Sequence, residues 1–233
     1  MVGIYEYIRT QGFKPLHFEE HYTRLDALSQ QLFRRPLAIS HNELKEQIAA
    51  TLRTERYSAR TMNLVCVRSD ENGTISIEGN EMLYKTFSLR ALRPEGFVCR
   101  VSGELLTLNT SAKEALLALN RTMAQIGDDG VAIWVNEQDE LLAIDGAPII
   151  AVFENEIRFS AYSDGVERDF VKKNIDKLHR NVTTSTIRLS ELSAAKEILY
   201  IDHRGITALN GFGGHRYMDI TAEKIANMVA ESE

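Results

Sequence analysis

The sequence offers little that would indicate metal binding or a disulfide-linked fold. Its two cysteines, Cys66 and Cys99, each stand in an apolar run, and neither belongs to the paired spacing of a metal site. We expect both to be buried free thiols of a protein from a reducing compartment. The six histidines form no HExxH motif or other paired ligand spacing, so no metal is predicted.

Excess positive charge and long apolar runs are also missing. The formal net charge is -6 and the pI about 5.6, so no global positive field would draw the chain onto nucleic acid or an anionic membrane. The amino terminus has no charged leader followed by a long apolar run, and nothing indicates a membrane span. We expect a cytoplasmic protein that binds neither nucleic acid nor membranes and whose partner is a small molecule or another protein.

What the sequence does contain is the pattern of an α/β protein in two parts. The 233 residues are 44% hydrophobic and 26% charged, which is typical of a globular protein. Short alternation in residues 3–10 predicts a strand, and leucines at steps of three and four predict a helix from Phe18. Ser40 and Glu43 form a capping-box pair for a second helix. With predicted strands at 61–69 and 81–92, residues 1–93 make a small α/β domain.

Proline and glycine in residues 93–96 mark the predicted boundary to a larger domain, residues 97–233. Ser111 and Glu114 form a second capping-box pair, for a helix that Gly127 ends. Strands and helices alternate irregularly over the rest, which predicts a second sheet. Its strands are expected at 97–101, 104–108, 131–136, 140–144, 149–153, 156–160, 197–202 and 205–210, and its further helices at 165–178 and 220–231.

Four segments resemble, in the right order, motifs of the class-IV aminotransferases, which include branched-chain and D-amino-acid aminotransferases and aminodeoxychorismate lyase. They are GIYEYIRTQGFKPLHFEEHYTRL with His21, Arg24 and Leu25; LNTSAKEALLALNRTMAQIGDDGVAIWVNEQDELLAI; DGVERDF with Arg168; and KEILYIDHRGITAL. The resemblance implies fold type IV of the pyridoxal-phosphate enzymes: a small N-terminal α/β domain, a larger mixed-sheet, barrel-like C-terminal domain, a cofactor cleft between them and a homodimer.

Carried over residue by residue, the resemblance names three contacts to the cofactor phosphate. Arg24 would bind it with its guanidinium, although a helix arginine paired with Glu20 or Asp26 is the plainer interpretation. The amides of a turn at Gly165, Val166 and Glu167 would form the second contact, with a carboxylate where the family has threonine. The third contact falls near His203 and Arg204.

The residues that would carry the covalent chemistry do not match the family. Leu106 or Thr107 stands where the family has its Schiff-base lysine, and neither carries an amine. Lys113 is the nearest alternative, but it lies inside a predicted helix, where we expect an ordinary surface lysine. The family's acid beside the pyridine nitrogen falls on Ile144 or on Asp145 in a turn.

These mismatches predict a pseudoenzyme: a homologue without pyridoxal 5'-phosphate that binds a small anionic metabolite or no ligand at all. The alternative is an active pyridoxal-phosphate-dependent aminotransferase or 4-amino-4-deoxychorismate lyase in which Lys113 is the nucleophile. A structural or regulatory protein that uses the dimer surface is the third hypothesis.

Overall fold

The computed structural model describes residues 3–80, 82, 87–101, 108–175, 178 and 180–230. Its contacts divide the chain into two compact units. The first unit is Met1–Lys85 together with Leu108–Glu114, and the second is Thr86–Thr107 together with Ala115–Glu233. The mixed α/β class predicted from the sequence is confirmed. The domain boundary at residues 93–97 stays a prediction, and the chain's return to the first unit at residues 108–114 was not anticipated.

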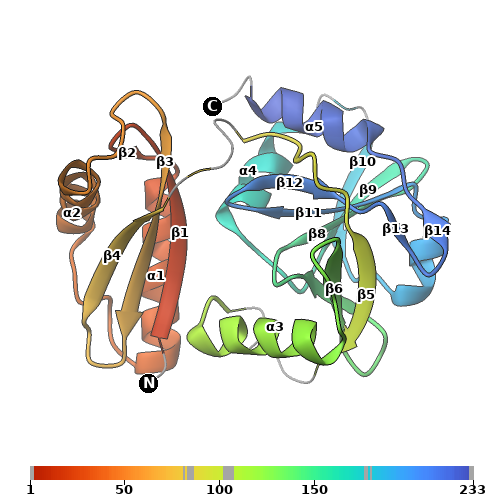
Figure 1. Cartoon of the computed structure of the whole chain (residues 1–233), viewed down its shortest axis with the longest axis horizontal. Coiled ribbons are helices and arrows are strands. Elements are labelled where there is room, and N and C mark those ends of the chain that lie inside the picture. Colours follow the sequence, from red (N-terminus) through yellow and green to blue (C-terminus); the bar gives the residue numbers. More distant parts are fainter. Residues whose placement is uncertain are drawn as a thin grey trace. The chain divides into compact units, whose positions relative to one another are not determined.

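The first unit is an antiparallel sheet with helices on one face (Figure 1). The strand order is β2-β1-β3-β4, with bounds Lys14–Pro15, Gly3–Gln11, Met62–Asp70 and Ile75–Asn80. Alternation along β1 turns Ile4 and Ile8 toward the helices α1 (Phe18–Phe33) and α2 (His41–Thr54), whose apolar faces complete this core. The predicted cap of α2 is confirmed, since the Ser40 side chain accepts a hydrogen bond from the Glu43 amide.

The start of helix α3 (Ser111–Met123) is attached to the edge of β1. The Tyr5 amide donates to the Asn109 carbonyl at 3.0 Å, and Ile4 forms a bridge with Thr110. The capping residue is Thr110, whose hydroxyl accepts from the Lys113 amide at 3.2 Å, so the predicted Ser111 cap is wrong by one residue. Ser111 instead accepts from the Gly3 amide. The helix ends before the predicted stop at Gly127.

The described residues of the second unit form two five-stranded sheets of mixed direction. One has the order β10-β9-β8-β11-β12, with bounds Asn181–Ser185, Glu156–Ser160, Ile149–Val152, Glu197–Asp202 and Gly205–Ala208. The other has the order β14-β13-β5-β6-β7, with bounds His215–Arg216, Gly211–Phe212, Glu95–Arg100, Gly130–Val135 and Leu141–Ile144. The predicted strand at 104–108 lies outside the described residues except for Leu108, and much of 81–92 lies outside them too.

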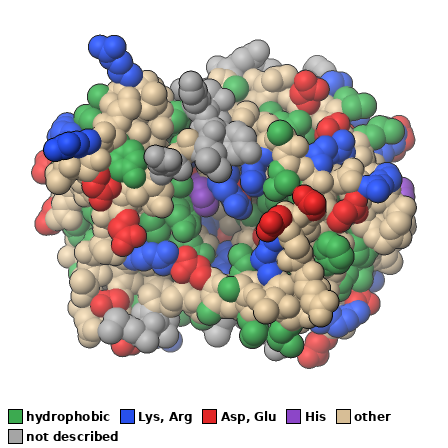
Figure 2. All heavy atoms as spheres, viewed as in Figure 1, with side chains coloured by type: hydrophobic (Ala, Val, Ile, Leu, Met, Phe, Trp, Pro, Cys, Tyr) green, Lys and Arg blue, Asp and Glu red, His purple; other side chains and the backbone are tan. Residues whose placement is uncertain are grey.

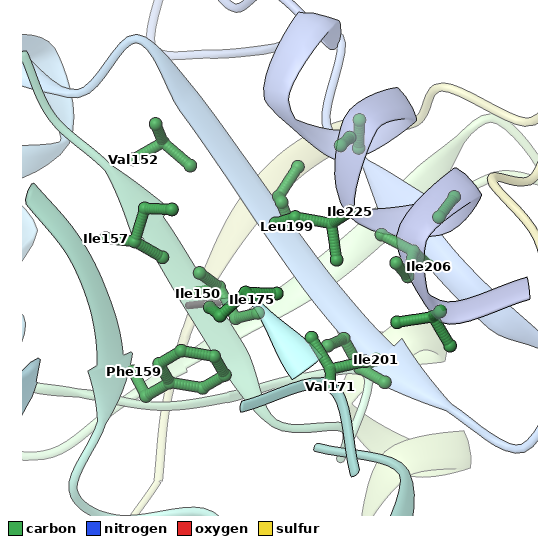
Figure 3. Packing of buried hydrophobic residues seen from close by; sticks show 14 of the residues in the cluster. Ile150, Val152, Ile157, Phe159, Val171, Ile175, Leu199, Ile201, Ile206 and Ile225 are labelled. Atoms are coloured by element: carbon green, nitrogen blue, oxygen red, sulfur yellow. The ribbon is translucent and has the colours of Figure 1, made fainter. Parts of the chain in front are cut away.

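Besides the larger part of α3, the described residues of the second unit form the helices α4 (Val166–Asn174) and α5 (Ile220–Ala230) and the short 3-10 helix η3 (Leu189–Ala194). Figure 3 shows how Val171 of α4 and Ile225 of α5 pack with Leu199 and Ile201 of β11. Cys66 and Cys99 are buried free thiols, as expected. Among the helices of the described residues, none is long and apolar enough to cross a membrane.

Candidate functional site

A buried carboxylate on β1 is the centre of a polar cluster in the first unit. Glu6 is 4% exposed. Its Oε2 lies 3.1 Å from Nδ1 of His21, and its Oε1 accepts from Nε of Arg24 at 3.1 Å and from Nδ2 of Asn109 at 2.9 Å. Lys113 joins through Asn109, because its Nζ donates to Asn109 Oδ1 at 3.1 Å. We call these five residues the Glu6 cluster.

Local periodicity explains why the cluster forms. Glu6 lies between Ile4 and Ile8 on the face of β1 that is turned to the helices. His21 and Leu25 follow each other at a step of four on the buried stripe of α1, and Arg24 lies beside them at a step of three from His21. The strand and the helix therefore bring an acid, an imidazole and a guanidinium to one point of the core.

The electrostatics of the Glu6 cluster favour an ionised carboxylate. Burial opposes the charge, but the hydrogen bond with His21 and the positive charge of Arg24 outweigh it, so that the pKa of Glu6 falls to about 2. The carboxylate of Glu6 then faces two cationic side chains, because Arg24 bonds it directly and Lys113 is joined to it through Asn109.

Lys113 is not the surface lysine that we expected. It is only 7% exposed, although it lies in the first turn of a helix. The reason is the edge pairing with β1, which buries the start of α3 and directs the amine to Asn109. Arg24 likewise pairs with Glu6 of the neighbouring strand, a contact that neither the predicted phosphate role nor the alternative pairing with Glu20 or Asp26 included.

A second ion pair holds the start of α3 in the first unit. Arg68 of β3 donates from both terminal nitrogens to the carboxylate of Glu114, at 2.9 and 3.0 Å. Its guanidinium also lies over the ring of Tyr5, 5.2 Å from the centroid. The segment with Asn109 and Lys113 is therefore anchored by backbone pairing and by a fork of hydrogen bonds.

The other predicted phosphate contacts belong to the second unit. Gly165 precedes α4 as its N-terminal cap, and Val166 and Glu167 begin the helix with buried side chains. Arg204 donates from Nε to Asp202 at 2.9 Å, and its own amide donates to the same carboxylate at 2.8 Å. His203 lies in the same turn between β11 and β12. The charge of Arg204 is therefore matched by an adjacent carboxylate.

The resemblance gives Ile144 or Asp145 as the position of the acid beside the ring nitrogen, and neither is arranged to donate a proton there. Ile144 is fully buried in β7. Asp145 accepts from the Ala132 amide of β6 at 2.9 Å and from Arg121 of α3 at 2.7 Å, so its carboxylate is already engaged. Burial raises the pKa of Asp145 despite these partners. Leu106 and Thr107, at the lysine position, lie outside the described residues.

Sequence reasoning found Arg24 and the fallback Lys113 but missed Glu6 and Asn109, the residues that connect them. A glutamate between two isoleucines of a half-buried strand was the available signal for Glu6. Nothing local identified Asn109, whose partner is 103 positions away. Over the described parts of the chain, no group of three or more His, Cys, Asp or Glu residues could hold a metal ion.

Comparison with known proteins identifies the fold. No protein-family profile and no curated protein sequence matches the chain. A protein assigned as a branched-chain amino acid aminotransferase from Thermotoga maritima is similar over 97% of this chain and 84% of that one, with TM-score 0.81 and 19% identity. A protein assigned as 4-amino-4-deoxychorismate lyase from Legionella pneumophila is similar over 99% and 91%, with TM-score 0.80 and 14% identity.

A branched-chain aminotransferase from the archaeon Thermoproteus uzoniensis, determined with norvaline, is similar over 97% of this chain and 84% of that one, with TM-score 0.81 and 15% identity. The chain therefore has the two-domain α/β fold of the class-IV aminotransferases, fold type IV of the pyridoxal-phosphate enzymes. These three solved structures are a branched-chain aminotransferase, a protein assigned to that activity and a protein assigned as 4-amino-4-deoxychorismate lyase.

Proposed function

We propose that the chain is a noncatalytic class-IV aminotransferase-like protein that binds a small anionic metabolite at the Glu6 cluster. The observation that supports this proposal is the joining of Arg24 and Lys113 to one ionised carboxylate, Glu6. Cationic side chains that are held in place before a ligand arrives bind anions with little loss of side-chain freedom. The ligand classes that suit such a site are phosphates and carboxylates.

Each residue of the Glu6 cluster has a role in this proposal. Glu6 holds Arg24 through Nε, the inner nitrogen of the guanidinium, and so orients the planar fork. Asn109 uses both ends of its amide, one to hold Glu6 and one to hold the amine of Lys113. His21 fixes the second oxygen of Glu6. The carboxylate is thus a positioning residue, and the two cations would contact the anion.

The residues of the second unit do not fit pyridoxal 5'-phosphate. When bound in an enzyme, this cofactor supplies a carbonyl for an amine and a protonated ring that accepts electrons. The position of the acid that keeps the ring protonated holds either Ile144, which has no acidic group, or Asp145, whose carboxylate is engaged by Arg121. A carboxylate, Glu167, also stands in the phosphate turn. These features support loss of the cofactor's chemistry.

Equilibrium binding measured by calorimetry tests the proposal. The probes are pyridoxal 5'-phosphate, as a phosphate on an organic ring, and pyridoxal, which lacks the phosphate. We expect the phosphorylated probe to bind more tightly, and Arg24→Gln to weaken it about 10-fold or more, the effect of losing one charged hydrogen bond. Arg60→Gln, which removes an exposed cation elsewhere in the first unit, is the matched control. Equal affinity in Arg24→Gln and wild-type protein contradicts the proposal.

A second candidate function is an active pyridoxal-phosphate-dependent aminotransferase or 4-amino-4-deoxychorismate lyase. The burial of Lys113 favours it, because a buried amine held by a hydrogen bond, here to Asn109, is a possible nucleophile. Under this alternative, protein incubated with the cofactor becomes yellow, and Lys113→Met remains colourless while Arg60→Gln does not. A colourless wild-type protein that binds the phosphorylated probe supports the first candidate.

The fold also supports a homodimer, which we propose as the state in solution. Light scattering on the purified chain measures this directly, and a single monomeric mass at micromolar concentration contradicts it. The dimer does not enter the argument for the Glu6 cluster, whose five residues come from one chain.

A further inference from the structure

A groove on the first unit combines three cations with an apolar floor. Its volume is about 550 Å³, and it lies between the β1–β2 turn and helix α2. The turn contributes Phe13, Lys14 and Pro15, and the helix contributes Lys45, Ala49 and Arg53 as well as Glu46. We call it the hairpin groove. None of these residues belongs to the Glu6 cluster.

The helical side of the groove follows from sequence spacing. Lys45, Ala49 and Arg53 stand at steps of four on one face of α2. The two cations are thus two turns apart, about 12 Å along the axis at 1.5 Å per residue. The small side chain of Ala49 leaves the space between them open. Arg53 lies over the ring of Phe13, 5.2 Å from its centroid, and so connects the helix to the turn.

The charges of the groove are not balanced by the protein. Among the described residues, Lys14, Lys45 and Arg53 have no ion pair or side-chain hydrogen bond. Three positive charges and the single negative charge of Glu46 leave a net charge of 3 − 1 = +2 in a chain whose formal net charge is -6. Figure 2 shows basic and acidic side chains of the chain's surface side by side over the face that it presents. The groove is therefore a local positive field.

The turn that forms the other wall is held rigidly. Gly12 has φ +59, its amide donates to the Thr61 carbonyl at 2.9 Å, and its carbonyl accepts from Thr10 and Asn63 at 2.7 Å each. A Cβ at this position would come within 2.4 Å of the Ala59 carbonyl oxygen. These hydrogen bonds hold Gly12 and so fix the turn that carries Phe13 and Lys14 before any ligand binds, which lowers the entropy cost of binding.

We infer that the hairpin groove binds a small organic phosphate monoester that carries a flat apolar group. A monoester has a charge of about -2 at neutral pH, which matches the net charge of the groove. Lys45 and Arg53 would bind the phosphate from two sides, and Phe13, Pro15 and Ala49 would contact the apolar group. Because the groove is open to solvent, binding is expected to weaken with salt and below a pH of about 6, where the second phosphate proton returns.

A nuclear magnetic resonance titration of the full chain with phenyl phosphate tests the inference. We expect saturable shifts of the amides of Phe13, Lys45, Ala49 and Arg53. The double variant Lys45→Gln, Arg53→Gln should bind at least 10-fold more weakly, whereas Lys224→Gln, which removes an exposed cation of α5, should bind as wild type does. Both substituted positions are exposed and glutamine is a good helix former, so α2 should persist.

Three results would overturn the inference. The first is a set of shifts confined to the surroundings of Arg24 and Lys113 and absent from Phe13, Lys45, Ala49 and Arg53, which would assign phenyl phosphate to the Glu6 cluster alone. The second is unchanged affinity in the double variant or in Ala49→Leu, which keeps every charge but fills the floor of the groove. The third is inorganic phosphate binding as tightly as phenyl phosphate, because an apolar contact would then contribute nothing.

Discussion

Replacing Glu6 by glutamine should destabilise the first unit in a way that depends on pH. In the folded protein the pKa of Glu6 falls from 4.5 to about 2, because the hydrogen bond with His21 and the charge of Arg24 outweigh burial. Since one pKa unit corresponds to about 1.4 kcal/mol, ionisation of Glu6 stabilises the folded unit by about 3 kcal/mol at neutral pH. A pKa lowered by folding stabilises above the unfolded pKa, so this contribution is lost as the pH falls from about 4.5 toward about 2.

Hydrogen–deuterium exchange of the amides that pair β1 with β3 measures this effect within the first unit. At pH 7, Glu6→Gln should lower the protection of these amides by about two orders of magnitude, the ratio that corresponds to about 3 kcal/mol. The difference from wild type should shrink at pH 4 and nearly disappear at pH 2. Glu137→Gln, at an exposed turn of the second unit, is the control and should change protection little. A difference that stays constant from pH 7 to pH 2 refutes the assignment.

Three further predictions concern other features of the fold. Gly12→Ala should destabilise the protein by roughly 2 kcal/mol or more, because the φ of Gly12 is +59 and a Cβ would approach a backbone oxygen to 2.4 Å. Urea unfolding measures this change, and a midpoint equal to that of wild type contradicts it. Glu197→Gln should lower the free energy of unfolding by roughly 1–2 kcal/mol, since the carboxylate accepts from the Thr221 amide at 2.7 and 2.9 Å and caps α5. Thermal unfolding at pH 7 measures this change, and a Tm equal to that of wild type speaks against the cap. Burial raises the pKa of Cys66 to about 11, so thiol reagents should modify it far more slowly in the native than in the unfolded protein at pH 8. Peptide mapping follows the reaction, and equal rates of modification in both states would show that the thiol is accessible.

Residues close together in the sequence were enough to predict the cap of α2 in the first unit. The cap of α3 and the burial of Lys113 depend on pairing between distant segments and were not predicted. Ser40 lies three residues before Glu43, so the cap of α2 needs no other part of the chain. The cap of α3 was misplaced by one residue because Ser111 is used by the Gly3 amide, 108 positions away. The same distant strand edge explains the burial of Lys113. Helical periodicity alone cannot predict that a first turn will be covered by a strand.

The candidate site shows the same division. Arg24 was found through the resemblance of His21, Arg24 and Leu25 to a family motif, but its contact with Glu6 of β1 was not anticipated. The separation of strand and helix along the chain hides such a contact from pattern reasoning, and the alternation along β1 was the available signal that Glu6 faces the core. In the second unit, Asp145 was correctly interpreted as a turn residue, while its ion pair with Arg121 required the fold.

On the proposed function, the chain keeps the fold and a cationic cluster, and we expect none of its lysines to bond covalently to a carbonyl cofactor. Intact-protein mass spectrometry after incubation with pyridoxal 5'-phosphate at about its binding constant, followed by borohydride reduction, tests it most directly. Borohydride converts a reversible bond between a lysine and the carbonyl into a permanent one. We predict an unchanged mass. A stoichiometric gain of one reduced phosphopyridoxyl group, mapped to Lys113, would contradict the claim.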